Sequence, residues 1–454
     1  MFDYILEKIK NVVADYVEFH YEEVSSTRIV HTKQSIELVQ TSKTSSGNVR
    51  VFYNGAWGFS CFNEKNIDTV VEEALENAKI ASKFLTKKVS LKKASPVVDS
   101  IKTEYKINPL DITIEEKNEL VKKYNSLLQD ESIASSRVTY ADWNVKKYFI
   151  NSSGSNIFQD KTFTGISYGA MAKDGTNVQQ AFESVGQYGG WELVVNQEEK
   201  IEEVKKRAID LLKAKKVESG KYLVLIDPLL AGVFAHEAFG HLSEADFLSE
   251  NPRMQKVMKI GRQFGPEFLN IIDDGSIPGL AGYTPYDDEG VKARKNYLIK
   301  NGKLNSRLHS METASLMGEE VTGNARALNP FYQPIVRMTN TYIDNGSSSL
   351  EEMLEMIEDG IYALNYLGGM TNLEMFTFSS GYAYRIKNGK KVELLRDVNL
   401  SGNVFTTLHN IVAIGNDLTH HGGLGGCGKG GQSGLPVSTG SPHILIKDVL
   451  VGGV

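Results

Sequence analysis

The sequence predicts an α+β protein, with a mixed α/β N-terminal domain and a strand-rich C-terminal domain. Two observations predict this class. Helical and strand patterns alternate through the first half, whereas turns, glycines and short strands dominate the second. The chain has 454 residues, and a lysine-rich helix end followed by Val217–Gly220 marks a boundary. We therefore expect domains at residues 1–217 and 218–454.

Four helices are predicted in the first domain, where apolar residues recur at helical spacing. They are residues 2–13, Ile67–Leu85, Ile114–Leu128 and Glu198–Lys215. β-branched and aromatic runs predict strands at Tyr16–Tyr21, Arg28–His31, Ser35–Val39 and Val49–Tyr53, and several more between residues 136 and 195.

The second domain is predicted to open with a buried strand, Tyr222–Ile226, followed by a helix. Asp227 and Pro228 mark the start of this helix, because Asp is a preferred N-cap and Pro suits the first helical turn. One more helix is predicted at Leu350–Leu367 and a last strand at His443–Ile446.

Composition and charge exclude several classes of protein. Hydrophobic residues make up 41% and charged residues 23%, as in ordinary globular proteins. The net charge of −6 disfavours nucleic-acid binding. No apolar run is long enough for a transmembrane helix, and the charged N-terminus does not resemble a signal peptide.

The two cysteines, Cys61 and Cys427, are too few and too far apart for a disulfide framework. We therefore expect a reducing compartment and a cytoplasmic protein. Cys61 lies in a predicted strand after Trp57–Ser60, so we expect it to be buried in the core.

The segment His236-Glu237-Ala238-Phe239-Gly240-His241 carries the most informative chemistry. Two imidazoles and a carboxylate on one helix are typical of a zinc hydrolase. The two His are five residues apart, which places them about 140° apart on an ideal α-helix. A π-bulge, which Gly240 permits, would bring them to one face. The alternative is a structural pair of His that hydrogen-bonds to Glu237 and Glu244.

Two His need a third ligand to form a metal site. The candidates are Cys427, His409, His420, His421, Asp287, Asp288 and Glu289. Cys427 lies in a glycine-rich loop, Gly422–Gly431, and its thiolate is a good zinc ligand; the alternative is a free thiol beside a turn. The acidic run Asp287–Glu289 most often marks a solvated turn; as a functional feature it would support the metal or hold a peptide amino group.

The same loop imitates two nucleotide-binding motifs. Gly423–Gly428 spells GxGxxG, and Gly423–Lys429 spells GxxxxGK. Both motifs need a following helix to hold phosphate, and the glycines and proline after Lys429 disfavour one. We therefore exclude nucleotide binding.

Several motifs resemble the TldD family of zinc metallopeptidases, within the wider TldD/PmbA group. In the first half these are Asp15–Glu18, Gly47–Val51 and Gly55–Phe59. In the second half they are His236–His241, Tyr286–Gly290, Thr322–Arg326, Arg337–Asn340, Ser401–Asn403, Cys427–Gln432 and Val451–Gly453.

The resemblance implies a zinc-dependent peptidase of the HExxxH type that acts on small or unfolded peptides. It assigns the metal ligands to His236, His241 and Cys427, and the catalytic carboxylate to Glu237, which would activate a zinc-bound water. It also implies a homodimer, or a heterodimer with a paralogous subunit that lacks the metal motif.

Two other functions fit the same residues. One is a cysteine hydrolase with Cys427 as nucleophile and a base such as His409. The other is a non-catalytic subunit of a protease complex. For the peptidase, capture of the peptide by strand addition along an edge strand of the glycine-rich half would give a sequence-tolerant site.

Overall fold

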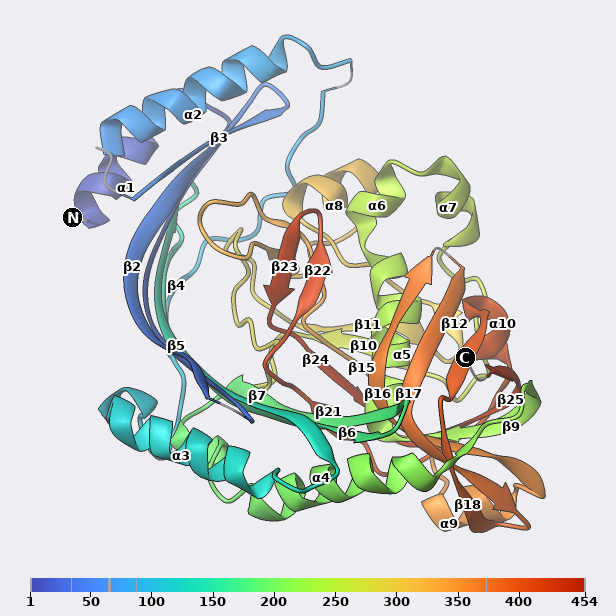
Figure 1. The fold of residues 1–454 in the computed structure, drawn as a ribbon. Coiled ribbons are helices and arrows are strands. Elements are labelled where there is room, and N and C mark those ends of the chain that lie inside the picture. Colours follow the sequence, from blue (N-terminus) through green and yellow to red (C-terminus); the bar gives the residue numbers. More distant parts are fainter. Residues whose placement is uncertain (1, 34, 64–66, 87, 373, 453–454) are drawn as a thin grey trace.

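The computed structural model describes residues 2–33, 35–63, 67–86, 88–372 and 374–452. Helices and mixed sheets are both present and the C-terminal region is rich in strands, which confirms the α+β class. Figure 1 shows the C-terminal half lying against the concave side of a curved N-terminal sheet.

The N-terminal sheet has seven strands in the order β3-β2-β1-β5-β6-β4, with β7 also paired to β6. All of its pairings are antiparallel except that between β4 and β6. The strands are β1 Tyr16–Thr32, β2 Ile36–Tyr53, β3 Ala56–Phe62, β4 Val98–Lys102, β5 Ile133–Asn151, β6 Asn156–Asp174 and β7 Asn177–Tyr188.

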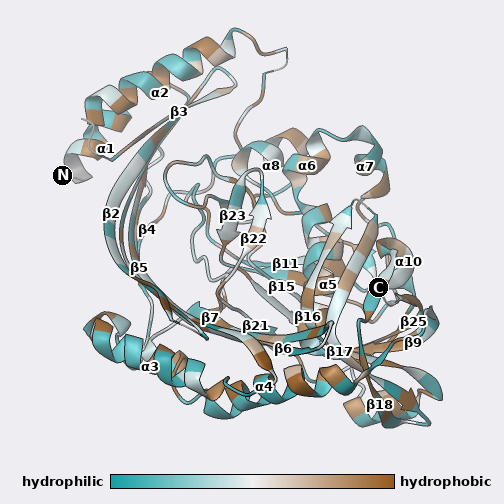
Figure 2. Cartoon of the chain, in the orientation of Figure 1, coloured by the Kyte–Doolittle hydropathy of each residue, from teal (hydrophilic) through white to brown (hydrophobic). Residues whose placement is uncertain are grey.

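Four helices cover this sheet, in the places that the sequence predicts. They are α1 Phe2–Lys10, α2 Ile67–Ser82, α3 Ile114–Leu127 and α4 Glu198–Lys213. Apolar residues of α1 and α2 pack on β1 and β2, and those of α3 and α4 pack on β5 and β6. Figure 2 shows hydrophilic and hydrophobic residues alternating along these helices, as expected for helices with one buried face.

The first two strands are longer than predicted. The short strands expected at Tyr16–Tyr21 and Arg28–His31 are parts of β1, and those at Ser35–Val39 and Val49–Tyr53 are parts of β2. The two strands pair from Tyr16↔Phe52 to His31↔Ile36. The central parts of β1 and β2 are rich in Ser and Thr and carry no apolar alternation. Only their pairing with neighbouring strands identifies them as strand residues.

In the C-terminal half, one sheet closes on itself. β9 Gly220–Ile226 pairs with β16 Asp359–Asn372 and with β25 Ile444–Gly452, and the ring continues through β19 Asn399–Asn403 and β17 Met375–Lys387 back to β16. Attached to it are β18 Lys390–Arg396, β20 Ile411–Ile414 and β8 Lys215–Lys216. The boundary expected between residues 217 and 218 stays a prediction.

A six-stranded sheet lies beside this ring, in the order β12-β11-β10-β15-β24-β21. Its strands are β10 Ile271–Asp274, β11 Lys295–Lys300, β12 Lys303–Leu304, β15 Asn340–Ile343, β21 Thr419–His421 and β24 Ser438–Ser441. Two small hairpins join β13 Ala325–Arg326 to β14 Ile335–Val336, and β22 Cys427–Lys429 to β23 Gln432–Leu435. The helix α5, Pro228–Ala235, contacts both the ring and this sheet.

The remaining helices are short. They are α6 Ala245–Ser249, α7 Pro252–Val257, α8 Met311–Met317, α9 Leu350–Glu355 and α10 Val404–His409. The helix predicted at Leu350–Leu367 is therefore wrong beyond Glu355. Ser349 and Glu352 form a capping box that starts α9, but the apolar run after Gly360 is a strand of the ring. A short apolar run fits a buried strand as well as a buried helix.

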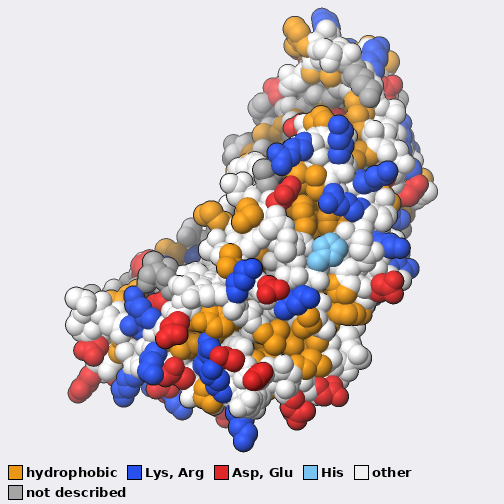
Figure 3. Space-filling view, turned by 90° about the vertical axis from the view of Figure 1, so that its right-hand side faces the viewer, with side chains coloured by type: hydrophobic (Ala, Val, Ile, Leu, Met, Phe, Trp, Pro, Cys, Tyr) orange, Lys and Arg blue, Asp and Glu red, His pale blue; other side chains and the backbone are white. Residues whose placement is uncertain are grey.

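Two further sequence expectations concern the burial of Cys61 and the presence of membrane-crossing helices. Cys61 is half-buried rather than buried, because β3 is the edge strand of its sheet. No helix in the described residues has the length and apolar character needed to cross a bilayer. On the face shown in Figure 3, basic, acidic and hydrophobic side chains are intermingled.

Candidate metal centre

The helix α5 is fixed at its start by Asp227. One carboxylate oxygen of Asp227 accepts a hydrogen bond of 2.8 Å from the backbone N–H of Leu230, which is the predicted N-cap interaction. The other oxygen accepts one of 2.8 Å from the backbone N–H of Asn365 in β16. The carboxylate therefore ties the first turn of the helix to a strand of the ring.

The helix continues into a π-helical turn, His236–Gly240, in which the backbone N–H of His241 bonds to the carbonyl of His236. The π-bulge that the two His need in order to converge is thus present. It brings the two imidazoles together, with ring centroids 5.1 Å apart and planes at 85°. Gly240 has an ordinary helical φ of −58°. A Cβ on Gly240 would lie 1.9 Å from Sδ of Met338, so this position needs glycine for space rather than for backbone freedom.

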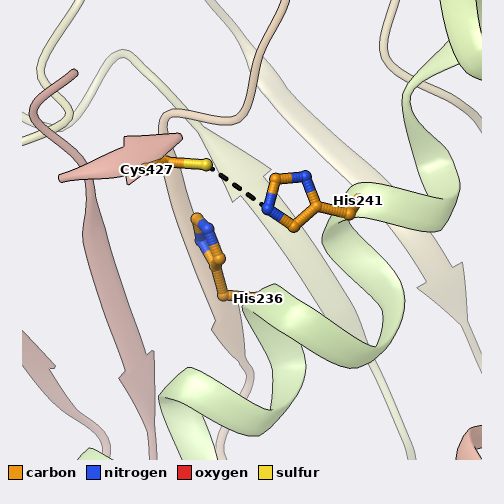
Figure 4. A group of neighbouring side chains, drawn as sticks. All are labelled: His236, His241 and Cys427. Carbon is orange, nitrogen blue, oxygen red and sulfur yellow. Dashed lines mark hydrogen bonds between the residues drawn. The ribbon is translucent and has the colours of Figure 1, made fainter. Parts of the chain in front are cut away.

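Cys427 completes the cluster from the β22–β23 hairpin. Its Sγ lies 3.3 Å from Nε2 of His241, and one ligand atom from each of His236, His241 and Cys427 lies within 4.8 Å of the others. Figure 4 shows the three side chains converging from the helix and the hairpin. His236 and Cys427 are buried and His241 is half-buried.

The electrostatics favour a thiolate. Burial raises the pKa of Cys427, but hydrogen bonds and charge from His236 and His241 outweigh burial and lower it to about 5. Burial lowers the pKa of His241, but its bonds to Cys427 and Glu244 raise it to about 10. Nδ1 of His236 is buried without a hydrogen-bond partner in the described structure.

These residues fit a zinc ion. Two imidazoles and a thiolate are typical zinc ligands, and tetrahedral bonds of about 2.0–2.3 Å put neighbouring ligand atoms roughly 3.5 Å apart. The separation of 3.3 Å between Cys427 and His241 is close to that value. A buried nitrogen without a partner, as in His236, is also what a missing ligand bond would leave.

Glu244 orients one of the imidazoles. Its carboxylate is buried and lies 3.0 Å from Nδ1 of His241, which directs Nε2 of that ring toward Cys427. Burial raises the pKa of Glu244, but His241 and Lys429 lower it below its ordinary value, so the group is ionised. Metal-binding His commonly donate their second N–H to such a carboxylate.

Glu237 lies between two cavities. One, of about 530 Å³, is also lined by His236, Cys427 and Tyr366, and its walls come from both halves of the chain. The second, of about 350 Å³, is also lined by His241 and Thr371. Within the described residues, the Glu237 carboxylate has no hydrogen-bond or ion-pair partner, so it is available to water or substrate.

The other candidate His ligands lie outside the cluster. His409 is exposed at the end of α10. His420 and His421 lie on β21; His421 lines the larger cavity, and burial lowers its pKa to about 4. Neither forms part of the three-residue cluster.

The solvated turn expected at Asp287–Glu289 is wrong. The three acidic residues also do not belong to the cluster of His236, His241 and Cys427. All three residues are buried. Asp288 pairs with Lys147, and Glu289 lies 3.2 Å from Arg50, both on the N-terminal sheet. The carboxylates thus join the two halves. The sequence does not reveal this role, because the basic partners are about 140 and 240 residues away.

The fold and this site define an α+β protein with a candidate metallohydrolase centre. Models for PmbA/TldA metallopeptidase domains match the chain along most of its length: domain 1 at residues 17–78, the central domain at 107–216 and the C-terminal domain at 219–453. The chain belongs to this PmbA/TldD family of metallopeptidases, which confirms the resemblance noted in the sequence.

Relatives agree with this assignment. A metalloprotease of Synechocystis sp. is 42% identical over 97% of this chain and 95% of its own. A zinc metalloprotease TldD homolog of Saccharolobus solfataricus is 31% identical over 100% of both chains. A crystal structure of a Thermotoga maritima protein has a TM-score of 0.80 at 23% identity, covers 100% of both chains, and shows the same fold.

Proposed function

We propose that this protein is a zinc-dependent peptidase that hydrolyses small or unfolded peptides. The observation that carries the proposal is the convergence of His236, His241 and Cys427 beside the free carboxylate of Glu237. The family is one of metallopeptidases, and one relative is named a zinc metalloprotease.

Each residue has a distinct part in the proposed reaction. His236, His241 and Cys427 would hold zinc, which supplies Lewis-acid chemistry for the scissile carbonyl and the attacking water. Glu237 accepts the proton of that water and later delivers it to the leaving amine. Glu244 holds the His241 ring in place. The cavity between the two halves of the chain holds the peptide.

An open strand edge supports the proposed mode of peptide binding. β9 pairs with β16 only as far as Ala363, while β16 continues to Asn372. Tyr366 of this extension lines the larger cavity and Thr371 lines the smaller one. A peptide added to this edge would pass Glu237 and bind through its backbone, which suits a site with little sequence preference.

We further propose that the protein works as a homodimer or with a paralogous subunit.

A cysteine hydrolase is the second candidate, although not with His409 as its base. Cys427, His241 and Glu244 form a hydrogen-bonded series of 3.3 Å and 3.0 Å, the arrangement of a thiol, a base and an orienting carboxylate. A chelator separates the two candidates, because it abolishes hydrolysis by the zinc enzyme and spares the thiol enzyme.

The proposal is tested by hydrolysis of an unstructured peptide by wild type, Glu237→Gln and a control, Glu250→Gln. Glu250 is an exposed residue beyond the site. We expect Glu237→Gln to keep its zinc and to lose about 10²- to 10⁴-fold in kcat, the usual contribution of a general base, while the control matches wild type. Full activity of zinc-loaded Glu237→Gln would refute the role of Glu237.

A further inference from the structure

We propose that Lys429 is a positioning residue of the metal centre, which fixes the His241 ring through Glu244 and ties the Cys427 hairpin to the His-bearing helix. This inference rests on the proposed zinc site. It concerns a residue outside the ligand set, and it follows from the contacts of one ammonium group.

Lys429 makes three polar contacts. Its Nζ lies 3.0 Å from Oε2 of Glu244 and 2.6 Å from Oδ1 of Asp246, and donates a hydrogen bond of 2.8 Å to the carbonyl of Val336. An ammonium group has three N–H donors. All three are therefore engaged by the protein itself.

The contact with Glu244 links Lys429 to the ligand His241. The same oxygen, Oε2 of Glu244, lies 3.0 Å from Nδ1 of His241. Glu244 is only 1% exposed, and a buried carboxylate is costly unless it is paired. The ammonium of Lys429 supplies that pairing and holds the carboxylate against Nδ1 of His241, which keeps Nε2 of the ring toward Cys427.

Lys429 also holds in place the strand that carries Cys427. It lies two residues after Cys427 in the same short strand, β22. The exposed Gly428 separates the two residues within β22, and the exposed glycines Gly425, Gly426 and Gly430 flank the strand. Glycine loses more conformational freedom on folding than any other residue. The contacts of Lys429 with Glu244 and Asp246 fasten this strand to residues that follow the π-helical turn.

A different role for Lys429 is binding of a substrate carboxylate, because the residue lines the smaller cavity beside Glu237. The geometry disfavours this role, since a substrate would have to displace one of three existing acceptors. The two roles also predict different results. A substrate-binding lysine affects KM and leaves metal affinity unchanged, whereas a positioning lysine affects metal affinity in the absence of substrate.

The experiment measures zinc affinity by competition with a chromophoric chelator, and the visible absorption of the cobalt-substituted protein. The variants are Lys429→Met and Lys429→Arg in the full chain. The matched control is Lys117→Met, which removes another lysine paired with a buried carboxylate, Asp142 at 2.7 Å, from the N-terminal half.

We expect Lys429→Met to bind zinc about 10- to 100-fold more weakly than wild type, as for other residues that support metal ligands. Its thiolate-to-cobalt absorption should shift, Lys429→Arg should recover part of the affinity because it keeps the charge, and Lys117→Met should bind as wild type does. Unchanged zinc affinity and cobalt spectrum in Lys429→Met would overturn the inference while leaving the zinc site intact. An equal loss in Lys117→Met would also overturn it, by showing a general effect of stability. Failure of wild type to bind zinc would instead overturn the proposed function, and this inference with it.

Discussion

The guanidinium of Arg337 donates a hydrogen bond of 2.6 Å to the backbone carbonyl of Cys427. Arg337 is fully buried, and its other terminal nitrogen donates to the carbonyl of Gln432 at 3.3 Å. Cys427 begins β22 and Gln432 begins β23. One buried side chain thus holds both strands of the hairpin that presents the thiolate.

Replacing Arg337 by Met should loosen this hairpin. The change leaves two carbonyls without their donor, so we expect a loss of about 2–4 kcal/mol in the free energy of unfolding. In a Cys61→Ser background, Cys427 should also react faster with a thiol reagent. Denaturant unfolding and labelling rates measure the two effects. Arg137→Met, which breaks an exposed pair with Glu37, is the control and should change stability little. Equal stability of the two variants would contradict this account of Arg337.

Replacing Gly240 by Ala should destabilise the protein through a clash. The new Cβ would lie 1.9 Å from Sδ of the buried Met338, and such overpacking typically costs about 1–3 kcal/mol. Combining it with Met338→Ala should cost less than the two single changes added together, because the second change removes the clashing atom. Gly452→Ala is a control, since its Cβ meets nothing closer than 3.7 Å. Additive losses in thermal or denaturant unfolding would show that Met338 is not the obstacle.

Stability should depend on pH through Glu18, which lies at the junction of the two halves. Glu18 and Glu289 share Arg50, at 2.9 Å and 3.2 Å. Burial and the charge of Glu289, opposed by Arg50, raise the pKa of Glu18 to about 8. In the unfolded chain a Glu titrates near about 4.3. At pH values between these two pKa values, Glu18 is protonated in the folded protein and ionised in the unfolded chain. The contribution of Glu18 to the free energy of unfolding is therefore lost as pH rises from about 5 to 8.

Glu18→Gln, which cannot lose a proton, should therefore become more stable relative to wild type as pH rises through this range. The measurement is the free energy of unfolding at several pH values, with the exposed Glu37→Gln as control. A difference between Glu18→Gln and wild type that does not change with pH would show that Glu18 is ionised throughout.

The elements that the sequence predicts correctly are those with a local signal. Asp227 and Pro228 mark the start of α5. The five-residue spacing of the two His shows that they converge only through a π-bulge, and the π-helical turn meets that condition. The family resemblance points to Cys427 as the third member of the cluster. The errors arise where strand pairing rather than a local pattern decides the structure: the strand after Gly360 pairs with the distant β9, and the Ser- and Thr-rich middles of β1 and β2 pair with each other and, for β1, with the distant β5.

Contacts between the halves could not be predicted for the same reason. Asp288 and Glu289 look like members of an exposed turn until Lys147 and Arg50 are placed opposite them. The contacts of Lys429 and Arg337 likewise have no signal in the sequence, because each joins segments roughly 90 or more residues apart. Only the folded chain shows that these residues surround Cys427.

In the proposed site, His236, His241 and Cys427 together bind one zinc ion. Zinc binding is measured as the zinc content of purified wild type and Cys427→Ala, side by side, by elemental mass spectrometry after zinc reconstitution and removal of excess metal. We expect about one zinc per chain in wild type, as for a single mononuclear site, and a sharp fall in Cys427→Ala. Absence of zinc from wild type would rule out the zinc site, and full retention of zinc by Cys427→Ala would rule out Cys427 as a ligand.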